Sequence, residues 1–377
     1  MILTSLLLTI LCFVCLFKHF FIVIIQNYSW TQATAIFIHT FCSSAKLLKG
    51  FREHTHWVNS IDYSAYSDDQ LICSGSIDKT VRVWDMETKK KFNYSMDIQV
   101  MYDQTIRFWD IKNGQQLEKF NVHTDGISGI EFSPFDGGRY LCSGSWDKTI
   151  CLWDIETFKS LHVFNGHEGR VWCVDMSPLQ SSNNSKSDNI GKDLIGGNGY
   201  TICSGSYDNT VRIWDIEKTK SFIIFKGHIG SVMSVRYGSN ELGINGGANT
   251  ILSGSIDKSV RLWDIRSGQQ IQVFNGHMRS ISAVDYSPFI VNNIEVGSSS
   301  NVICSGSYDN TIRFWDIRSN KNELHAIKGN DKIDDGILCL KFVSLKRKRK
   351  DSRNNDSNVC GVNLCYGLWS GSVCIWG

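Results

Sequence analysis

One short segment recurs five times along this chain, and this self-similarity constrains the fold more than any other feature. The clearest copy is TICSGSYDNTVRIWD at 201–215, and close relatives stand at 71–85, 140–154, 250–264 and 302–316. In each copy a run of β-branched and aromatic residues follows turn residues such as Asp208-Asn209, a pattern typical of two strands joined by a tight turn. Recurrence of one such unit indicates an array of repeats that pack against one another.

Trp-Asp pairs end six of the repeats. They are Trp84-Asp85, Trp109-Asp110, Trp153-Asp154, Trp214-Asp215, Trp263-Asp264 and Trp315-Asp316. With the Gly-His pairs at 166–167, 227–228 and 276–277, they make the chain resemble the WD-repeat family of β-propellers over roughly residues 45–377. The resemblance implies an all-β, seven-bladed-type β-propeller of four-stranded antiparallel blades. A closed ring of blades allows a chain of 377 residues to fold as one domain.

The second blade is predicted to be truncated. Trp84 and Trp109 stand too close together in the sequence for a four-stranded blade. TIRFWD and QLEKF supply the third and fourth strands of this blade, and MDIQVMY is expected to supply one more. Blade one is expected to run from His54 to about Phe92. A deletion or a mispredicted exon accounts for the gap, and we expect a weak sector near residues 93–110.

The two ends of the repeat region are predicted to close the ring. Residues 45–51 (AKLLKGF) resemble the outer strands of later blades, such as IQVF at 271–274. The last blade is a degenerate copy that stops at Trp376-Gly377 and has no outer strand of its own. The resemblance therefore implies that the N-terminal strand completes the last blade, which removes exposed sheet edges.

Residues 1–44 are predicted to form a segment separate from the propeller at 45–377. Residues 2–25 are nearly all apolar and are long enough to span a bilayer. Three interpretations stay open for this segment. The segment is either a transmembrane helix that anchors the chain, or a non-native extension, or an apolar strand or helix docked on the propeller.

Cysteine placement favours a reducing compartment. Four of the thirteen cysteines occupy the same repeat position, which recurs far apart around a ring and cannot form disulfides; they are Cys73, Cys142, Cys203 and Cys304. The propeller is therefore expected in the cytoplasm or nucleus, and to be membrane-anchored if residues 2–25 cross a bilayer. The basic run at 346–350 is either a nuclear import signal or a solvated loop.

Histidine, serine, aspartate and tryptophan recur together, as in a catalytic triad, but a repeated active site is implausible. The resemblance implies instead that His167, Ser204, Asp208 and Trp214 form a buried hydrogen-bond network that stiffens their blade. The corresponding residues in other blades are His228, Asp257, Trp263, His277, Asp309 and Trp315. The last blade, which has Gly329-Asn330 in place of Gly-His, is expected to be looser.

No catalytic or cofactor motif accompanies the repeats. The sequence has no phosphate-binding loop, nucleophile elbow or metal-ligand spacing, so we expect no enzyme activity, no cofactor, no metal and no small-molecule substrate. The formal net charge of +2 gives no electrostatic reason to expect nucleic acid.

The expected function is protein binding at the narrow face of the propeller, where family members often bind peptides. Two positions of each repeat are implied to point there: the residue before the turn aspartate, and the residues around the first-strand valine. The predicted contact residues are Trp57, Asn59, Ile77, Trp146, Arg170, Trp172, Tyr207, Met233, Ile256 and Tyr308. Aromatic residues and arginine are typical of interaction hot spots, which favours the group in blades three and four.

Two alternatives remain beside a non-catalytic scaffold that binds proteins or peptides. Trp-Asp-x-Arg sequences ending at Arg266 and Arg318 resemble the motif by which some WD-repeat proteins act as substrate receptors on cullin-RING ubiquitin ligases. The truncated second blade and the unusual N-terminus fit a degenerate, non-functional copy. A membrane contact through residues 2–25 is a further possibility.

Overall fold

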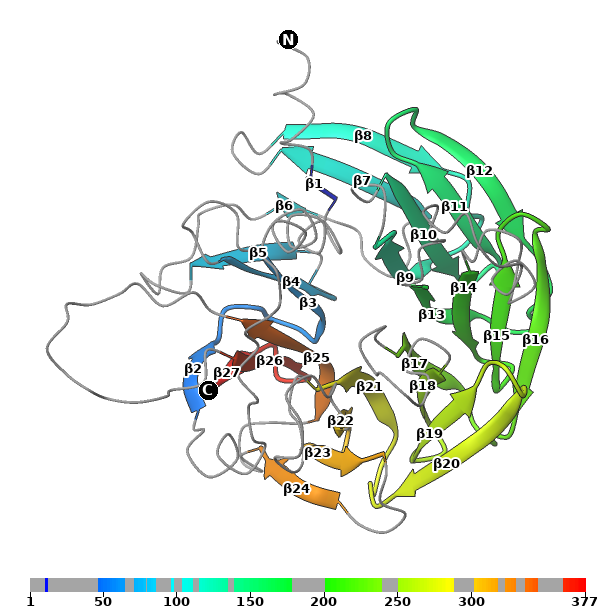
Figure 1. Cartoon of the computed structure of the whole chain (residues 1–377). Coiled ribbons are helices and arrows are strands. Elements are labelled where there is room, and N and C mark those ends of the chain that lie inside the picture. Colours follow the sequence, from blue (N-terminus) through cyan, green and yellow to red (C-terminus); the bar gives the residue numbers. More distant parts are fainter. Residues whose placement is uncertain are drawn as a thin grey trace, which may run out of the picture.

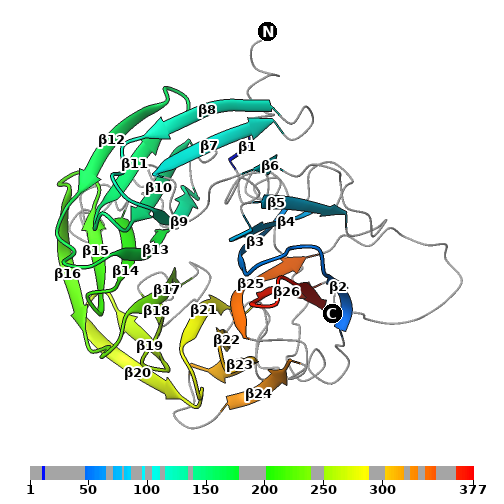
Figure 2. The ribbon, with the colours of Figure 1, turned by 180° about the vertical axis from the view of Figure 1, so that it is seen from behind.

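The computed structural model describes residues 11–12, 47–64, 71–78, 80–85, 96–97, 104–110, 115–134, 139–177, 201–238, 250–287, 302–317, 323–329, 336–344 and 362–377. These residues form antiparallel sheets placed side by side around a ring (Figures 1 and 2). Six sheets have four strands and one has three. The predicted four-stranded antiparallel blades are confirmed, but the described residues form six complete blades instead of seven, and the second sheet, predicted to be truncated, has three strands.

Blades three to six are continuous in sequence and run from the innermost to the outermost strand. Blade three is β9 (Ile127–Phe132), β10 (Tyr140–Ser145), β11 (Ile150–Asp154) and β12 (Lys159–Phe164). Blade four is β13 (Val171–Met176), β14 (Thr201–Ser206), β15 (Thr210–Asp215) and β16 (Lys220–Lys226). Blade five is β17 (Val232–Tyr237), β18 (Thr250–Ser255), β19 (Ser259–Asp264) and β20 (Gln269–Asn275). Blade six is β21 (Ile281–Tyr286), β22 (Val302–Ser307), β23 (Thr311–Asp316) and β24 (Glu323–Lys328).

The Ser-Gly-Ser motif lies on the second strand of these blades, and neighbouring sheets cover both faces of that strand. Every residue of β14 is buried. A side chain at Gly205 would place its Cβ 2.5 Å from a methyl carbon of Val232 and 2.7 Å from the sulfur of Cys173. Small residues at this position therefore allow adjacent sheets to pack closely. On the outermost strand β16, buried or partly buried residues alternate with exposed ones, as expected for a half-solvated edge.

Aromatic stacking joins successive blades. The phenylalanine at the end of an outermost strand packs on the tryptophan of the next blade, as Phe120 does on Trp153 with ring centroids 4.6 Å apart. Phe225 likewise contacts Trp263 of the next blade, with ring centroids 5.1 Å apart and the rings tilted by 33°. The repeated Trp-Asp pair thus supplies a fully buried ring at the contact between blades.

The predicted closure of the ring is confirmed by strand pairing. The last blade consists of β25 (Ile337–Ser344), β26 (Val362–Leu368), β27 (Val373–Trp376) and β2 (Leu47–Phe51). In it, β2 pairs antiparallel with β27, and Phe51 is the partner of Val373. Phe51 then stacks on Trp84 of blade one with ring centroids 4.6 Å apart. The N-terminal strand therefore belongs to the last blade and contacts the first.

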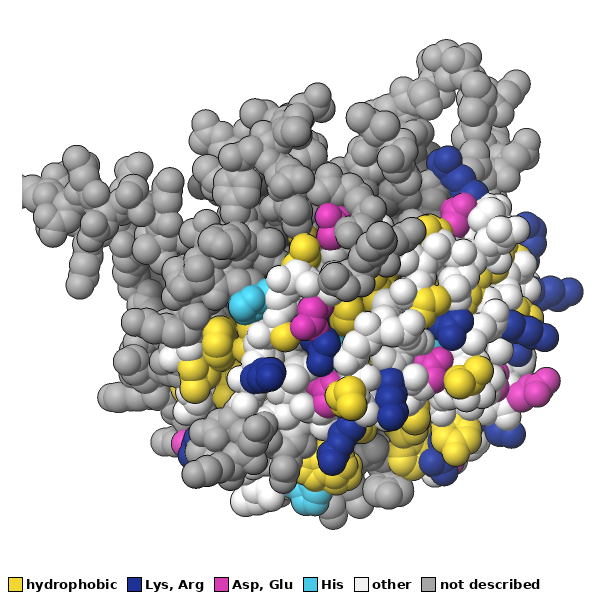
Figure 3. Space-filling view, turned by 90° about the horizontal axis from the view of Figure 1, so that it is seen from below, with side chains coloured by type: hydrophobic (Ala, Val, Ile, Leu, Met, Phe, Trp, Pro, Cys, Tyr) yellow, Lys and Arg dark blue, Asp and Glu magenta, His cyan; other side chains and the backbone are white. Residues whose placement is uncertain are grey.

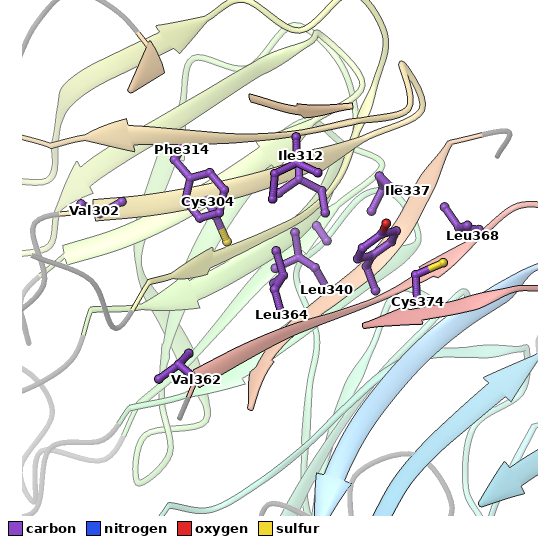
Figure 4. Packing of buried hydrophobic residues seen from close by; sticks show 13 residues of the cluster. Val302, Cys304, Ile312, Phe314, Ile337, Leu340, Val362, Leu364, Leu368 and Cys374 are labelled. Atoms are coloured by element: carbon purple, nitrogen blue, oxygen red, sulfur yellow. The ribbon is translucent and has the colours of Figure 1, made fainter. Parts of the chain in front are cut away.

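The last blade, which is blade seven, packs against blade six through a continuous apolar cluster. Figure 4 shows Cys304, Ile312 and Phe314 of blade six beside residues of blade seven, among them Leu340 and Leu364. All seven residues of β26 are buried. Apolar packing therefore fills the interior of a blade in which the last repeat has lost its histidine and turn aspartate.

The predicted boundary between blades one and two is wrong. Blade one consists of β3 (Val58–Ser64), β4 (Leu71–Ser76), β5 (Thr80–Asp85) and β6 (Met96–Asp97). The segment MDIQVMY was expected to add a strand to blade two, but its first two residues pair with β5 instead. Blade one therefore reaches beyond Phe92 and takes its outermost strand from the region assigned to its neighbour.

Blade two contains only three strands among the described residues. They are β1 (Leu11–Cys12), β7 (Thr105–Asp110) and β8 (Gln115–Asn121), in the order β1-β7-β8. The described part of the chain contains no helix that is long and apolar enough to cross a bilayer. Apart from Leu11–Cys12, the residues of the membrane-anchor prediction, 2–25, lie outside the described ranges.

Candidate partner-binding face

Both sets of predicted contact positions converge on one end of the propeller, which we call the turn face. In each complete blade, the backbone N–H of the residue that follows the second strand donates to a carbonyl just before the first strand. Tyr207 donates to Arg170 (2.8 Å), and Ile77 donates to Trp57 (3.0 Å). The equivalent pairs are Trp146 and Gly126, Ile256 and Ser231, Tyr308 and Ser280, and Trp369 and Gly336. The tight turns and the entering loops therefore share one surface.

Blades three and four place four of the predicted residues close together on the turn face. The rings of Trp146 and Trp172 meet edge to face with centroids 5.6 Å apart. The Arg170 guanidinium lies over the Trp146 ring, with Cζ 4.2 Å from its centroid, as in a cation–π contact. Tyr207 is 59% exposed, whereas Trp146 is only 9% exposed. The expectation that Trp146 is an exposed contact is therefore corrected: Arg170 and Trp172 help to bury it.

A second aromatic group joins blades six, seven and one on the same face. The rings of Trp57 and Trp369 lie 3.9 Å apart between centroids, and Tyr308 meets Trp369 edge to face at 5.4 Å. Trp369 thus contacts both of the predicted contact residues Trp57 and Tyr308, and each of these two is half-buried. Sequence reasoning missed Trp369, although it occupies the repeat position of Trp146 and Tyr308.

Exposed apolar residues on blades five and six extend the turn face. Ile229 and Met278 are among the most exposed large apolar side chains that the structure describes, and each directly follows the histidine of its repeat. The predicted contact Ile256 is also exposed. The backbone N–H of Ile229 donates to Oδ2 of the turn aspartate Asp257 (3.1 Å), the residue that follows Ile256. Sequence reasoning missed Ile229 and Met278, for which the signal is the position after the repeated histidine.

The remaining predicted contacts lie nearer the axis. Asn59, Trp172 and Met233 line a cavity of about 180 Å³ between the innermost strands, whereas Ile77 is half-buried in its turn. The indole N–H of Trp172 is buried and has no hydrogen-bond partner among the described residues. The turn face therefore lies beside a small cavity at the axis that Trp172 helps to line.

A layer of charged residues crosses the same cavity. Each described innermost strand contributes one at the same position, namely Asp62, Glu131, Asp175, Arg236, Asp285 and Lys341. Of these, Asp62, Glu131, Arg236 and Lys341 line the cavity. Lys341 lies 3.0 Å from Asp62, and Arg236 lies 3.3 Å from Glu131 on a strand two blades away. These cations already engage the carboxylates. The capacity of this end to bind a partner therefore rests mainly on its aromatic and apolar side chains.

The outer rim of the ring offers no comparable surface in the view of Figure 3. The outermost strands expose scattered apolar side chains, namely Leu161, Val163, Phe222, Ile224, Ile271 and Leu324. On the side shown in Figure 3, apolar side chains are interspersed with Lys and Arg. Isolated apolar residues of this kind are normal on a protein surface.

The histidine–serine–aspartate–tryptophan sets form hydrogen-bond networks inside the blades. In blade four, the Trp214 indole N–H donates to Ser204 Oγ (2.8 Å), and this oxygen lies 2.7 Å from His167 Nε2. His167 Nδ1 lies 2.7 Å from Asp208. The predicted residues of blades five and six, with Ser253 and Ser305, repeat this arrangement, as do His54 and His123 with their partners in blades one and three. The side chains of each of these networks are thus hydrogen-bonded to one another.

The chemistry of the network requires a neutral histidine. Burial lowers the pKa of His167, and likewise the pKa values of His54 and His228. The neutral ring donates from Nδ1 to the aspartate and accepts at Nε2 from the serine hydroxyl. Burial alone would raise the pKa of Asp78, but hydrogen bonds from Thr80 and His54 outweigh it and hold this pKa at about 2. A neutral histidine beside an ionised aspartate is thus the state that the fold favours.

Acidification is expected to destabilise the protein through these histidines. The unfolded chain takes up protons below a pH of about 6.5, whereas the buried rings resist protonation, so stability falls as pH falls through this value. The ionised Asp78 adds stability above about pH 4 that is lost as the pH falls toward 2. Thermal unfolding at constant ionic strength should give a lower Tm at pH 5.5 than at pH 7.5. An unchanged or higher Tm at pH 5.5 would contradict this reading of the networks.

Other predicted sites lie away from the turn face or outside the described residues. Arg266 is exposed in the turn between β19 and β20, where its backbone N–H donates to Asp264 (3.0 Å). Arg318 lies outside the described residues. Ligase docking through these arginines stays a prediction. In the described residues, no group of three His, Cys, Asp or Glu side chains is placed to hold a metal ion, and no disulfide joins the nine cysteines whose side chains are described.

Blades that carry repeated internal networks, around a ring closed by the N-terminal strand, define a β-propeller built from sequence repeats. Comparison with known families identifies the repeats: "WD domain, G-beta repeat" matches residues 45–85, 114–154, 158–215, 219–264 and 268–316. The chain belongs to the WD-repeat family. The matched ranges omit β25, β26 and β27 of the degenerate last blade and β1 and β7 of the incomplete blade two.

Two curated proteins show more limited similarity. The chain is 30% identical to the Lissencephaly-1 homolog of Caenorhabditis briggsae over 112 residues, which cover 25% of this chain and 27% of that protein. It is 21% identical to Autophagy-related protein 16 of Arabidopsis thaliana over 207 residues, which cover 51% of this chain and 37% of that protein. The match thus spans well under half the length of each relative.

Proposed function

We propose that this chain is a non-catalytic WD-repeat scaffold that binds a peptide segment of another protein on its turn face. Membership of a family of interaction propellers supports a scaffold. The histidines and aspartates that could suggest catalysis are engaged inside the blades. In this proposal, residues 45–377 carry the propeller, with seven blade positions of which the second is incomplete.

The observation that carries the proposal is the exposed apolar surface on one end of the ring. Tyr207, Ile229, Ile256 and Met278 come from blades four, five and six and stand at two repeated positions. Apolar and aromatic residues grouped beside a polar cavity are typical of protein-binding surfaces.

The partner segment is expected to place apolar side chains on the turn face. Ile229→Asp adds a charge to this apolar surface, and Tyr207→Ala removes a large exposed ring. Both side chains are exposed, so neither change should disturb folding. Each change is expected to weaken partner binding at least about tenfold, corresponding to about 1.4 kcal/mol for a contact near the centre of an interface.

Quantitative affinity purification measures this effect. Ile271→Asp serves as the matched control, because Ile271 is exposed on the outermost strand β20, away from the turns. Proteins retained by the wild type and by Ile271→Asp, but lost with Ile229→Asp and Tyr207→Ala, would support binding at the turn face. Equal recovery with all four chains would remove this face from consideration.

A further inference from the structure

In blade two, the inner edge of β7 needs a partner strand that the sequence directly before β7 is too short to supply. In every complete blade the third strand has a partner on each side, as β15 has in β14 and β16. In blade two, β6 of the preceding blade ends at Asp97 and β7 begins at Thr105, so the chain between them is too short for two more strands. Without another partner, β7 would present an open edge of N–H and C=O groups.

The strand that lies at this edge comes from the N-terminal apolar segment. β1 pairs antiparallel with β7, with Leu11 opposite Trp109 and Cys12 opposite Phe108. In blade three the same two positions of the third strand, Trp153 and Leu152, face Leu141 and Cys142. β1 therefore occupies the place of a second strand, in the same register and with the same Leu-Cys pair.

The surroundings of this position call for apolar residues. In blades three, four and six the cysteine at the Cys12 position is fully buried, because sheets cover both faces of the second strand. Phe108 is likewise fully buried, and its cluster includes Phe120 and Trp153. Burying apolar area on a strand contributes favourably to folding without any lipid, at roughly 25 cal/mol per Å². An apolar N-terminal segment is therefore suited to blade two itself.

We propose that the N-terminal segment is an intramolecular donor strand, which fills the second-strand position of the truncated blade through Leu11–Cys12. The propeller then begins before residue 45. The apolar pair Leu11–Cys12 suits a second-strand position, which is buried along its whole length in blades four and six. The residues after Cys12 are Phe13 and Val14, where the other repeats have Ser and Gly, so the donor strand restores backbone pairing and not the histidine network.

Disulfide trapping tests the register directly in the full chain. Opposed residues in antiparallel strands have Cα atoms about 4.5–5.5 Å apart, within the range of a disulfide. Phe108→Cys should form a disulfide with the native Cys12 under mild oxidation, identified by mass spectrometry of the linked peptides. Arg107→Cys, one position along β7, faces the other side of the sheet and should not form this bond. Linkage to Cys15 instead of Cys12, or none in a folded Phe108→Cys chain, would overturn the proposal.

A second measurement covers the case in which Phe108→Cys fails to fold. Cys12→Pro removes one backbone donor from β1 and disfavours strand pairing. Amide hydrogen exchange in β7 should accelerate several-fold in this variant, while exchange in β15 of blade four stays unchanged. Unchanged exchange in β7 would show that the N-terminal segment does not protect it.

Discussion

Trp214→Ala is expected to lower the free energy of unfolding by about 3–5 kcal/mol, the range for removing a large aromatic side chain from a core. Trp214 is fully buried and belongs to the apolar cluster that joins blades three and four. Its ring contacts Phe164 of the preceding blade edge to face, with centroids 6.0 Å apart. Its indole N–H also donates to Ser204 (2.8 Å). Urea unfolding followed by circular dichroism measures the loss.

Two further variants separate packing from hydrogen bonding at this position. Trp214→Phe retains an aromatic ring but removes the indole donor to Ser204, and should cost less than the alanine change, about 1–3 kcal/mol. Tyr207→Ala lies on the same blade but is mostly exposed, and should change stability by no more than about 0.5 kcal/mol. A Trp214→Ala loss as small as that of Tyr207→Ala would contradict the role given to the repeated tryptophans.

The parts of the fold that sequence predicted well are those that each repeat encodes locally. The Ser-Gly-Ser strand, its turn and the Trp-Asp strand occur together in one segment, so their pairing follows from one copy and recurs in the others. Ring closure was also predictable, because residues 45–51 look like an outer strand and the last blade lacks one. Complementary ends carry enough information to pair segments that are distant in sequence.

The incomplete blades were harder because their sequences no longer follow the repeat. Met96–Asp97 completes blade one only by pairing with β5, and nothing in MDIQVMY distinguishes that partner from β7. In the last blade, Ser370-Gly371-Ser372 imitates the strand motif of the other repeats. Strand register shows instead that Gly367 occupies the position of Gly144, since it faces Val373 as Gly144 faces Ile150. Ser370-Gly371-Ser372 therefore belongs to the turn between β26 and β27.

Burial on the turn face could not be predicted from single positions. Trp146 and Tyr207 occupy the same position in adjacent repeats, yet one is buried and the other exposed. The difference comes from their neighbours, because Arg170 and Trp172 both contact Trp146. Repeat alignment thus predicts which end of the ring a residue occupies, and the identity of adjacent side chains decides whether it is available to a partner.

A substitution at Gly371, in the turn where the last blade contacts the first, is also expected to cause a large loss of stability. Gly371 has φ +81°, and at the same turn position blades three to six have Lys148, Asn209, Lys258 and Asn310 with φ between 63° and 73°. Side chains are therefore tolerated in this backbone conformation. Gly371 differs in its neighbours, because an added Cβ would lie 2.4 Å from the carbonyl oxygen of His54. A backbone oxygen cannot move aside as a flexible side chain does.

Gly371→Ala is consequently expected to lower the free energy of unfolding by about 2–5 kcal/mol, from backbone strain together with displacement of the blade-one loop. His54 cannot yield easily, since its ring is bonded to Asp78 (2.8 Å) and Ser74 (2.8 Å). Gly268→Ala is the matched control: it has φ +67° and no atom within 4 Å of an added Cβ, so only strain of about 1 kcal/mol applies. Urea midpoints of the two variants measure the difference. Equal losses would contradict the inference that the blade-one backbone at His54 blocks a side chain at Gly371.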